Sequence, residues 1–129
     1  MSEAVLDTSA VLALLLDEPG AEVVQATLPG ALLSAVNLAE VVSKLCERGM
    51  PAEQAALAVE TIGVEIIPFD GTQARLTGAL RPATRSYGLS LGDRACLALG
   101  QLRSLPVLTA DVAWAELPGC QVMLIRGKH

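Results

Sequence analysis

Residues 4–18 read AVLDTSAVLALLLDE, and this stretch places a carboxylate between two apolar runs. The first run, residues 4–6, has the composition of a short buried strand, and residues 9–16 have that of a helix following it. Asp7 stands between the two. A buried charge costs several kcal/mol unless something pairs with it, so Asp7 must cap the helix, pair with another group or bind a metal ion.

The rest of the chain continues this alternation of short apolar runs with longer amphipathic segments, which is typical of a parallel sheet flanked by helices. Further strands are expected at residues 31–34, 64–67, 106–108 and 122–125. Further helices are expected at residues 19–28, 37–48, 51–63, 72–80 and 90–102. The helix at 72–80 runs into Pro82, which should break or kink it. No repeat or linker interrupts the pattern, so residues 1–129 are expected to form one domain.

The charge of the chain limits how it could hold nucleic acid. The net charge is −5, and only three aromatic residues are present. A general basic surface for gripping nucleic acid is therefore absent, and platforms on which bases could stack are few. An anionic substrate would have to be held by a local group of Arg and Lys side chains or by metal ions. The hydrophobic fraction of 52% also leaves apolar surface that a second chain could cover.

The cysteines and the single histidine form no recognisable metal motif. Cys46, Cys96 and Cys120 are widely spaced, and the only histidine is His129. We expect three reduced thiols packed as small hydrophobic groups, without zinc or disulfides. The longest apolar run, residues 10–16, is too short to span a membrane, and no signal-peptide pattern opens the chain. A cytoplasmic protein without a membrane segment is the expectation.

Four acids are predicted to meet at the carboxyl edge of the sheet, where open α/β folds bind their ligands. Asp7 follows the first strand and Asp111 follows the fourth, while Glu40 and Asp93 lie in the first turns of helices. Each acid alone could be a helix cap: Asn37 with Glu40 and Ser90 with Asp93 both have capping-box spacing.

Capping explains the four acids together less well. Two charges about 5 Å apart repel by about 3 kcal/mol at an effective dielectric of about 20, and a cap returns only about 1 kcal/mol. Mg²⁺ would resolve this conflict and leave room for a substrate phosphate. Asp70 also follows a strand, but nothing in the sequence brings it near the other acids, so capping is its expected role.

At this point the sequence resembles PIN-domain ribonucleases, and within them the VapC toxins of toxin–antitoxin pairs. The carrying segments are VLDTSAVLALLLDEPG, SAVNLAEV, LSLGDRACLAL and VLTADVAW, in family order and at family spacing. The resemblance implies a three-layer α/β/α sandwich with a parallel sheet in the strand order 3-2-1-4-5. It also implies a homodimer, and an antitoxin protein that blocks the active-site crevice.

The family's acidic residues carry over onto Asp7, Glu40, Asp93 and Asp111. The resemblance also suggests Thr109 as a metal-site or phosphate contact, although a hydroxyl at a strand end is common, and Asn37 as a residue that orients Glu40 or caps its helix. The implied enzyme is a Mg²⁺- or Mn²⁺-dependent endoribonuclease. It would hydrolyse RNA with a metal-activated water and leave a 5′-phosphate and a 3′-hydroxyl.

In this hypothesis Asp7 and Asp93 are the principal metal ligands. Asp111 completes the metal shell directly or through water, and Glu40 binds a second ion or positions the attacking water. Basic residues near the acids could guide the strand, although a solvated surface position explains each of them more simply. These residues are Lys44, Arg48, Arg81, Arg85 and Arg94.

Two other functions remain open from the sequence. A Mg²⁺-dependent phosphohydrolase of small molecules would also carry acids after the first and fourth strands. The aspartyl-phosphate enzymes have D-x-D at the first position, however, whereas this chain has D-T-S. A non-catalytic PIN interaction module would keep the fold and bind no metal.

Overall fold

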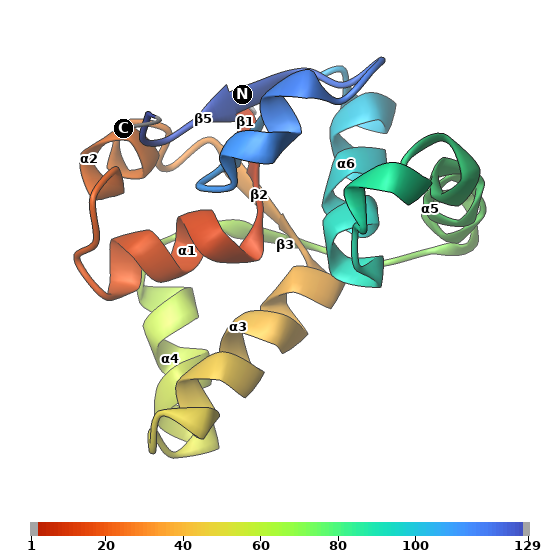
Figure 1. Cartoon of the computed structure of the whole chain (residues 1–129). Coiled ribbons are helices and arrows are strands. Elements are labelled where there is room, and N and C mark those ends of the chain that lie inside the picture. The colour runs from red at the N-terminus through yellow and green to blue at the C-terminus, as the bar shows by residue number, and fades with distance from the viewer. Residues whose placement is uncertain (1–2, 128–129) are drawn as a thin grey trace.

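Five short parallel strands form the centre of the protein, in the spatial order β3-β2-β1-β4-β5 (Figure 1). The computed structural model describes residues 3–127, so His129 lies outside the described residues. The strands are β1 (Ala4–Leu6), β2 (Ala31–Ser34), β3 (Glu65–Ile67), β4 (Val107–Thr109) and β5 (Val122–Leu124). The predicted sheet order and parallel pairing are confirmed.

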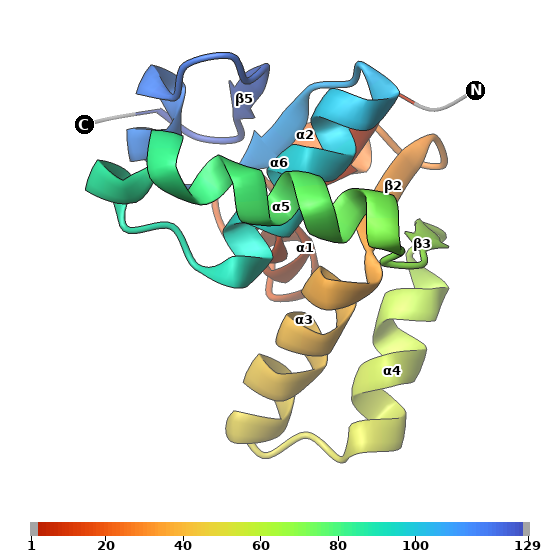
Figure 2. The same ribbon diagram turned by 90° about the vertical axis from the view of Figure 1, so that its right-hand side faces the viewer.

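Helices cover both faces of this sheet, as the alternating pattern predicts. They are α1 (Thr8–Leu15), α2 (Ala21–Gln25), α3 (Ala35–Glu47), α4 (Ala52–Thr61), α5 (Gly71–Ala83) and α6 (Leu91–Arg103), with two 3₁₀ turns, η1 (Arg85–Tyr87) and η2 (Val112–Glu116). Figure 2 shows α3 and α4 side by side as a hairpin that projects from the sheet, and α5 packed across α6. Within the described residues, no helix has both the length and the apolar character that a membrane span requires.

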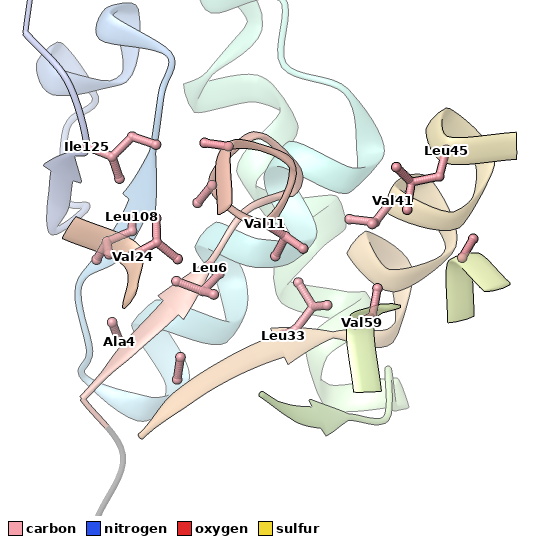
Figure 3. Packing of buried hydrophobic residues seen from close by; sticks show 14 residues of the cluster. Ala4, Leu6, Val11, Val24, Leu33, Val41, Leu45, Val59, Leu108 and Ile125 are labelled. Atoms are coloured by element: carbon pink, nitrogen blue, oxygen red, sulfur yellow. The ribbon is translucent and has the colours of Figure 1, made fainter. Parts of the chain in front are cut away.

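The three central strands, β1, β2 and β4, are buried throughout, so their successive side chains enter two separate cores, whereas the edge strands β3 and β5 are partly exposed. Leu6, Leu33 and Leu108 pack against α1, α3 and α4 on one face (Figure 3). On the other face Val5 packs with α6 and with Trp114 of η2. This two-sided burial fixes the register of β1, and it thereby fixes the point at which Asp7 leaves the sheet.

Several helix boundaries differ from the sequence prediction: α2 is shorter than the expected 19–28, and two other differences have a local cause. Helix α3 begins at Ala35 rather than at residue 37, because Ser34 at the end of β2 caps it by accepting from Val36 N–H at 3.2 Å. Asn37 is therefore not a cap. Helix α5 continues through Pro82 to Ala83, past the expected end at residue 80. Pro82 lies in the last turn, where few helical hydrogen bonds remain for it to disrupt.

The cysteines are free thiols, as predicted, but they do not share one environment. Cys96 is buried in α6 and Cys120 is half-buried, whereas Cys46 is exposed. The expectation of three packed thiols is wrong for Cys46, because this residue lies on the solvent side of α3 next to the buried Leu45.

Candidate active site

The four predicted acids line one pocket at the carboxyl edge of the sheet. This pocket, here called the acid pocket, has a volume of about 340 Å³ and is lined by Asp7, Thr8, Ser9, Leu12, Glu40, Lys44, Ser90, Asp93, Asp111 and Trp114. Asp70 is not among these residues; it caps α5 by accepting from Gln73 N–H at 2.9 Å. The parallel topology thus brings together four acids from distant parts of the sequence and leaves the fifth outside.

Asp7 is the most enclosed of the four, with 4% of its surface exposed. It caps α1 by accepting from Ala10 N–H at 2.8 Å, and Ser9 Oγ donates to the same oxygen, Oδ1, at 2.7 Å. Thr109 Oγ1 donates to Oδ2 at 2.6 Å and in turn accepts from Asp111 N–H at 3.0 Å. Thr109 is fully buried, so it supports two acids from behind and does not itself face the pocket.

Glu40 is held by a network that reaches across three helices. Thr8 Oγ1 donates to Glu40 Oε1 at 2.6 Å, and Asn37 Nδ2 donates to the same oxygen at 3.0 Å. Asn37 Nδ2 also lies 3.1 Å from the carbonyl of Gly92, at the start of α6. Asn37 is 1% exposed, so its contribution is to orient Glu40, as predicted for one of its two possible roles.

Gly92 provides the space that Glu40 occupies. A Cβ added at Gly92 would collide with the carboxylate of Glu40. Glycine weakens a helix by about 1 kcal/mol relative to alanine, yet here it lies in the first turn of α6, directly before Asp93. The glycine lets the carboxylate of α3 lie against the backbone of α6 beside Asp93.

Asp93 and Asp111 each use one carboxylate oxygen as a helix cap. Asp93 Oδ2 accepts from Ser90 N–H at 2.9 Å, which completes the predicted capping box of α6. Asp111 Oδ1 accepts from Ala113 N–H at 3.0 Å at the start of η2.

Capping leaves half of each of these carboxylates free. Among the described residues, no hydrogen bond engages Glu40 Oε2, Asp93 Oδ1 or Asp111 Oδ2. A carboxylate has about four acceptor positions on its two oxygens. Capping and ligand binding are therefore compatible at this site, and they need not be treated as alternatives.

The acids interact with one another electrostatically. Burial raises the pKa of Asp7 from 3.8 to about 6, against hydrogen bonds from Thr109, Ser9 and Ala10 that lower it, and the nearby Asp93 raises it further. The pKa of Asp93 is also raised, first by burial and then by the charges of Glu40 and Asp111. Asp93 is thus the acid whose charge is coupled to the other three.

Every hydrogen-bond donor to these four acids is electrically neutral. The donors are the hydroxyls of Thr8, Ser9 and Thr109, the amide of Asn37, and the backbone N–H groups of Ala10, Ser90 and Ala113. In the part of the chain that the structure describes, the only ion pair joins Arg126 to Glu18, at 3.9 Å. Among residues 3–127, no cationic side chain lies within ion-pair distance of these four acids.

This donor set suits a hard divalent cation held in an open arrangement. Free carboxylate oxygens are the ligands that Mg²⁺ prefers, and Mg²⁺ usually takes one or two carboxylates while it keeps several waters. Within residues 3–127, no group of three acidic, His or Cys side chains is close enough to enclose a metal ion. The side chains present fit a partly hydrated ion rather than an ion enclosed by protein ligands.

The basic residues near the acids differ in orientation. Arg94 follows Asp93 in sequence, but its Nη1 donates to the carbonyl of Thr77 on α5 at 3.0 Å. The expectation that Arg94 lies beside the pocket is therefore wrong, because successive residues of a helix point in different directions. Lys44 is the basic residue that lines the acid pocket.

Sequence reasoning did not single out several residues of the site. Thr8 and Ser9 are visible in the sequence as the two hydroxyls after Asp7, and each now binds one of the acids. Gly92 is visible as a glycine in the first turn of a helix. Trp114 lines the pocket, and its indole N–H is buried without a hydrogen-bond acceptor. In the sequence, Trp114 could have been identified as a site residue because it follows Asp111 by three residues.

The comparisons with known proteins agree with this fold. The family model of the PIN domain matches residues 4–119, so the chain belongs to the PIN domain family. Within it the chain is similar to ribonuclease VapC42 of Mycobacterium tuberculosis. The two are 30% identical over 117 residues, which cover 81% of this chain and 87% of the relative. The VapC ribonuclease Mb2780c of Mycobacterium bovis matches with the same values.

Solved structures show the same fold. A DNA-bound VapBC complex from Salmonella typhimurium has a chain that superposes with a TM-score of 0.76 at 20% identity, covering 98% of this chain and all of that one. VapC20 of Mycobacterium tuberculosis, described as a toxin that cleaves the sarcin–ricin loop, superposes with a TM-score of 0.74 at 19% identity, covering 92% of this chain and 99% of that one.

Proposed function

We propose that the chain is a metal-dependent endoribonuclease and the toxin of a toxin–antitoxin pair. The observation that carries this proposal is the acid pocket, which four carboxylates line without an ion pair to any cationic side chain of the described residues. The names of the relatives at 30% identity, both VapC ribonucleases, support the ribonuclease activity.

The four acids would have different roles in binding Mg²⁺ or Mn²⁺. Asp7 and Asp93 would be the principal ligands, as the resemblance to the family implies. Asp111 and Glu40 would complete the site with the oxygens that their hydrogen bonds leave free. When bound, the ion supplies Lewis acidity and makes water a stronger nucleophile at neutral pH.

The chain's own residues prepare the site for that chemistry. Thr109 and Ser9 fix the orientation of Asp7, and Asn37 and Thr8 fix that of Glu40. Because these supports are buried or half-buried, the carboxylates need little rearrangement when a ligand binds. Such preorganisation is a large part of electrostatic catalysis.

An RNA strand and an antitoxin protein are the proposed partners. VapC20 is described as cleaving the sarcin–ricin loop, and two further similar structures are described as a toxin–antitoxin complex and as a member of the VapBC family of toxin–antitoxin systems. These descriptions, together with the shared fold, support an antitoxin partner, and we propose that it covers the acid pocket. The proposed homodimer is supported by the apolar composition of the chain alone.

The test is cleavage of purified RNA with Mg²⁺, with Mn²⁺ and with a chelator. Asp93→Asn should lower the cleavage rate by at least about 100-fold, while the amide oxygen preserves the cap to Ser90 N–H. Asp70→Asn is the matched control, because Asp70 also caps a helix but lies outside the pocket. Equal activity in the chelator, or full activity of Asp93→Asn, would contradict the proposal. Release of inorganic phosphate from small phosphoesters in place of RNA cleavage would indicate a phosphohydrolase.

A further inference from the structure

The acid pocket shares lining residues with two neighbouring depressions on the surface. One, here called the α1–α3 groove, has a volume of about 430 Å³ and is lined by Ser9, Leu12, Leu16, Glu18, Lys44, Glu47 and Arg48. The other, the α3–α6 groove, has a volume of about 450 Å³ and lies between α3 and the start of α6. Among the described residues, Lys44 alone lines both grooves and the acid pocket.

We propose that Lys44 binds the backbone phosphate next to the scissile one and that the RNA strand continues from there along the α1–α3 groove past Arg48. This inference rests on the proposed function, since it assigns the path of the substrate of that site. It names a substrate-binding residue that is distinct from the four acids.

The position of Lys44 on α3 is the first argument. Lys44 follows Glu40 by four residues, and Arg48 follows Lys44 by four more, so the three side chains lie in a row along one helix face. Successive members of such a row are about 5–6 Å apart at Cβ. The row begins in the acid pocket and ends in the α1–α3 groove.

The freedom of Lys44 is the second argument. Its side chain is exposed and makes no ion pair with a described residue, although Glu40 and Glu47 are one helical turn away. An unpaired ammonium group beside four carboxylates remains available to an anion that reaches the pocket. In a chain with a net charge of −5, such a position is one of few that could attract a phosphate.

The charge of the two grooves decides the direction of the strand. The α3–α6 groove contains Lys44 together with Glu40 and Glu47, so its lining is net negative. The α1–α3 groove contains Lys44 and Arg48 against Glu18 and Glu47, and Glu18 is paired with Arg126. A polyanion therefore meets less repulsion along the α1–α3 groove.

The experiment measures binding apart from cleavage. A fluorescein-labelled 15-nucleotide oligoadenylate RNA is titrated with the full chain in EDTA, at KCl concentrations from 20 to 150 mM. Each phosphate contact on single-stranded RNA contributes about 0.7 to the slope of log K against log salt. Lys44→Ala should lower the slope by about 0.7 and weaken binding roughly 8- to 15-fold between 20 and 50 mM KCl. Arg48→Ala should have a similar effect.

Two variants serve as controls. Lys44→Arg preserves the charge and should preserve the slope. Arg103→Ala removes an exposed charge in the last turn of α6, away from both grooves and the acid pocket, and it should leave binding unchanged. Alanine favours a helix more than lysine does, so the Lys44→Ala chain should fold, which thermal unfolding checks.

The outcomes separate this inference from the proposed function. An unchanged slope in Lys44→Ala, or no binding by the wild-type chain at 20 mM KCl, would overturn the inference. Cleavage of RNA by the wild-type chain with Mg²⁺ is measured in parallel and tests the proposed function alone. Loss of slope in Arg103→Ala equal to that in Lys44→Ala would also overturn the inference, because binding would then follow overall charge.

Discussion

Replacing Asp7 by asparagine separates the charge of this residue from its hydrogen bonds. The amide oxygen can still accept from Ala10 N–H and Ser9, and the amide nitrogen would face Thr109, whose hydroxyl can accept as well as donate. The fold should therefore persist. Loss of the charge should abolish cleavage, but it should also stabilise the protein, which is an unusual combination for an active-site substitution.

The size of this stabilisation follows from the raised pKa of Asp7. The folded chain holds the proton more tightly than the unfolded chain, so ionisation of Asp7 destabilises the fold. This cost is absent below a pH of 3.8, grows as the pH rises toward 6 and is complete above it. A shift of about two pKa units corresponds to about 3 kcal/mol at pH 7.5 and about 1 kcal/mol at pH 4.5. Asp7→Asn should recover about 1–3 kcal/mol at pH 7.5, which raises Tm by roughly 4–12 °C.

Thermal unfolding in EDTA at pH 7.5 and at pH 4.5 measures this effect. The gain in Tm should be large at the higher pH and small at the lower one. Asp70→Asn is the matched control: Asp70 also caps a helix through its side chain, but it is exposed, and Asn caps as well as Asp. A lower Tm for Asp7→Asn at pH 7.5, or an equal gain at both pH values, would refute the reasoning.

Three further predictions concern the supports of the acids and the ion. Thr109→Val removes the donor to Asp7 and should cost about 1–3 kcal/mol, measured by urea unfolding, because a buried carboxylate loses a hydrogen bond; a change below about 0.5 kcal/mol, the range of ordinary surface substitutions, would contradict this. Gly92→Ala should displace Glu40, which should lower the Tm and lower cleavage at least about 10-fold. Adding Glu40→Ala to this variant should restore its Tm although not its activity. Mg²⁺ at about 100 times its Kd should stabilise the wild-type chain by about 2.7 kcal/mol in thermal unfolding, and it should stabilise Asp93→Asn much less; equal shifts would exclude Asp93 as a ligand.

The sheet could be predicted from the sequence because its central strands are buried on both faces. Uninterrupted apolar runs such as residues 4–6 and 31–33 mark where these strands lie, and the alternation with helices favours parallel pairing. The meeting of Asp7 and Asp111 follows from the order of the strands, since β1 and β4 are neighbours. The resemblance to a family supplied that order; the hydrophobic pattern alone permits others.

Side-chain directions could not be predicted in the same way. Spacing suggested that Asn37 caps a helix and that Arg94 lies beside the acids, and both expectations fail. Ser34 provides the cap of α3 because β2 runs into the helix without a loop. Arg94 turns toward α5 because α5 packs on that side of α6. Both facts depend on tertiary packing, which the spacing of residues along the sequence does not show.

From the sequence, capping and metal binding looked like alternative roles for the four acids, but the structure makes the two roles compatible. Capping occupies one oxygen of Asp93 and one of Asp111, and no hydrogen bond from a described residue engages the other. Glu40 caps no helix, and its hydrogen bonds from Thr8 and Asn37 likewise leave Oε2 free. The two roles even support each other. A carboxylate that is fixed by a backbone N–H or a hydroxyl has already lost its side-chain freedom, so binding an ion costs it less entropy.

The neutrality of the supporting donors has a further consequence. Had arginine or lysine fixed these acids, each ion pair would have neutralised the charge that, in our proposal, attracts a cation. Hydroxyls, an amide and backbone N–H groups fix the geometry and leave the negative potential in place. Burial makes the charged form of Asp7 unfavourable and raises its pKa to about 6. The geometry of the site is therefore in place without an ion. Binding of an ion would offset the destabilisation that the buried charge of Asp7 causes.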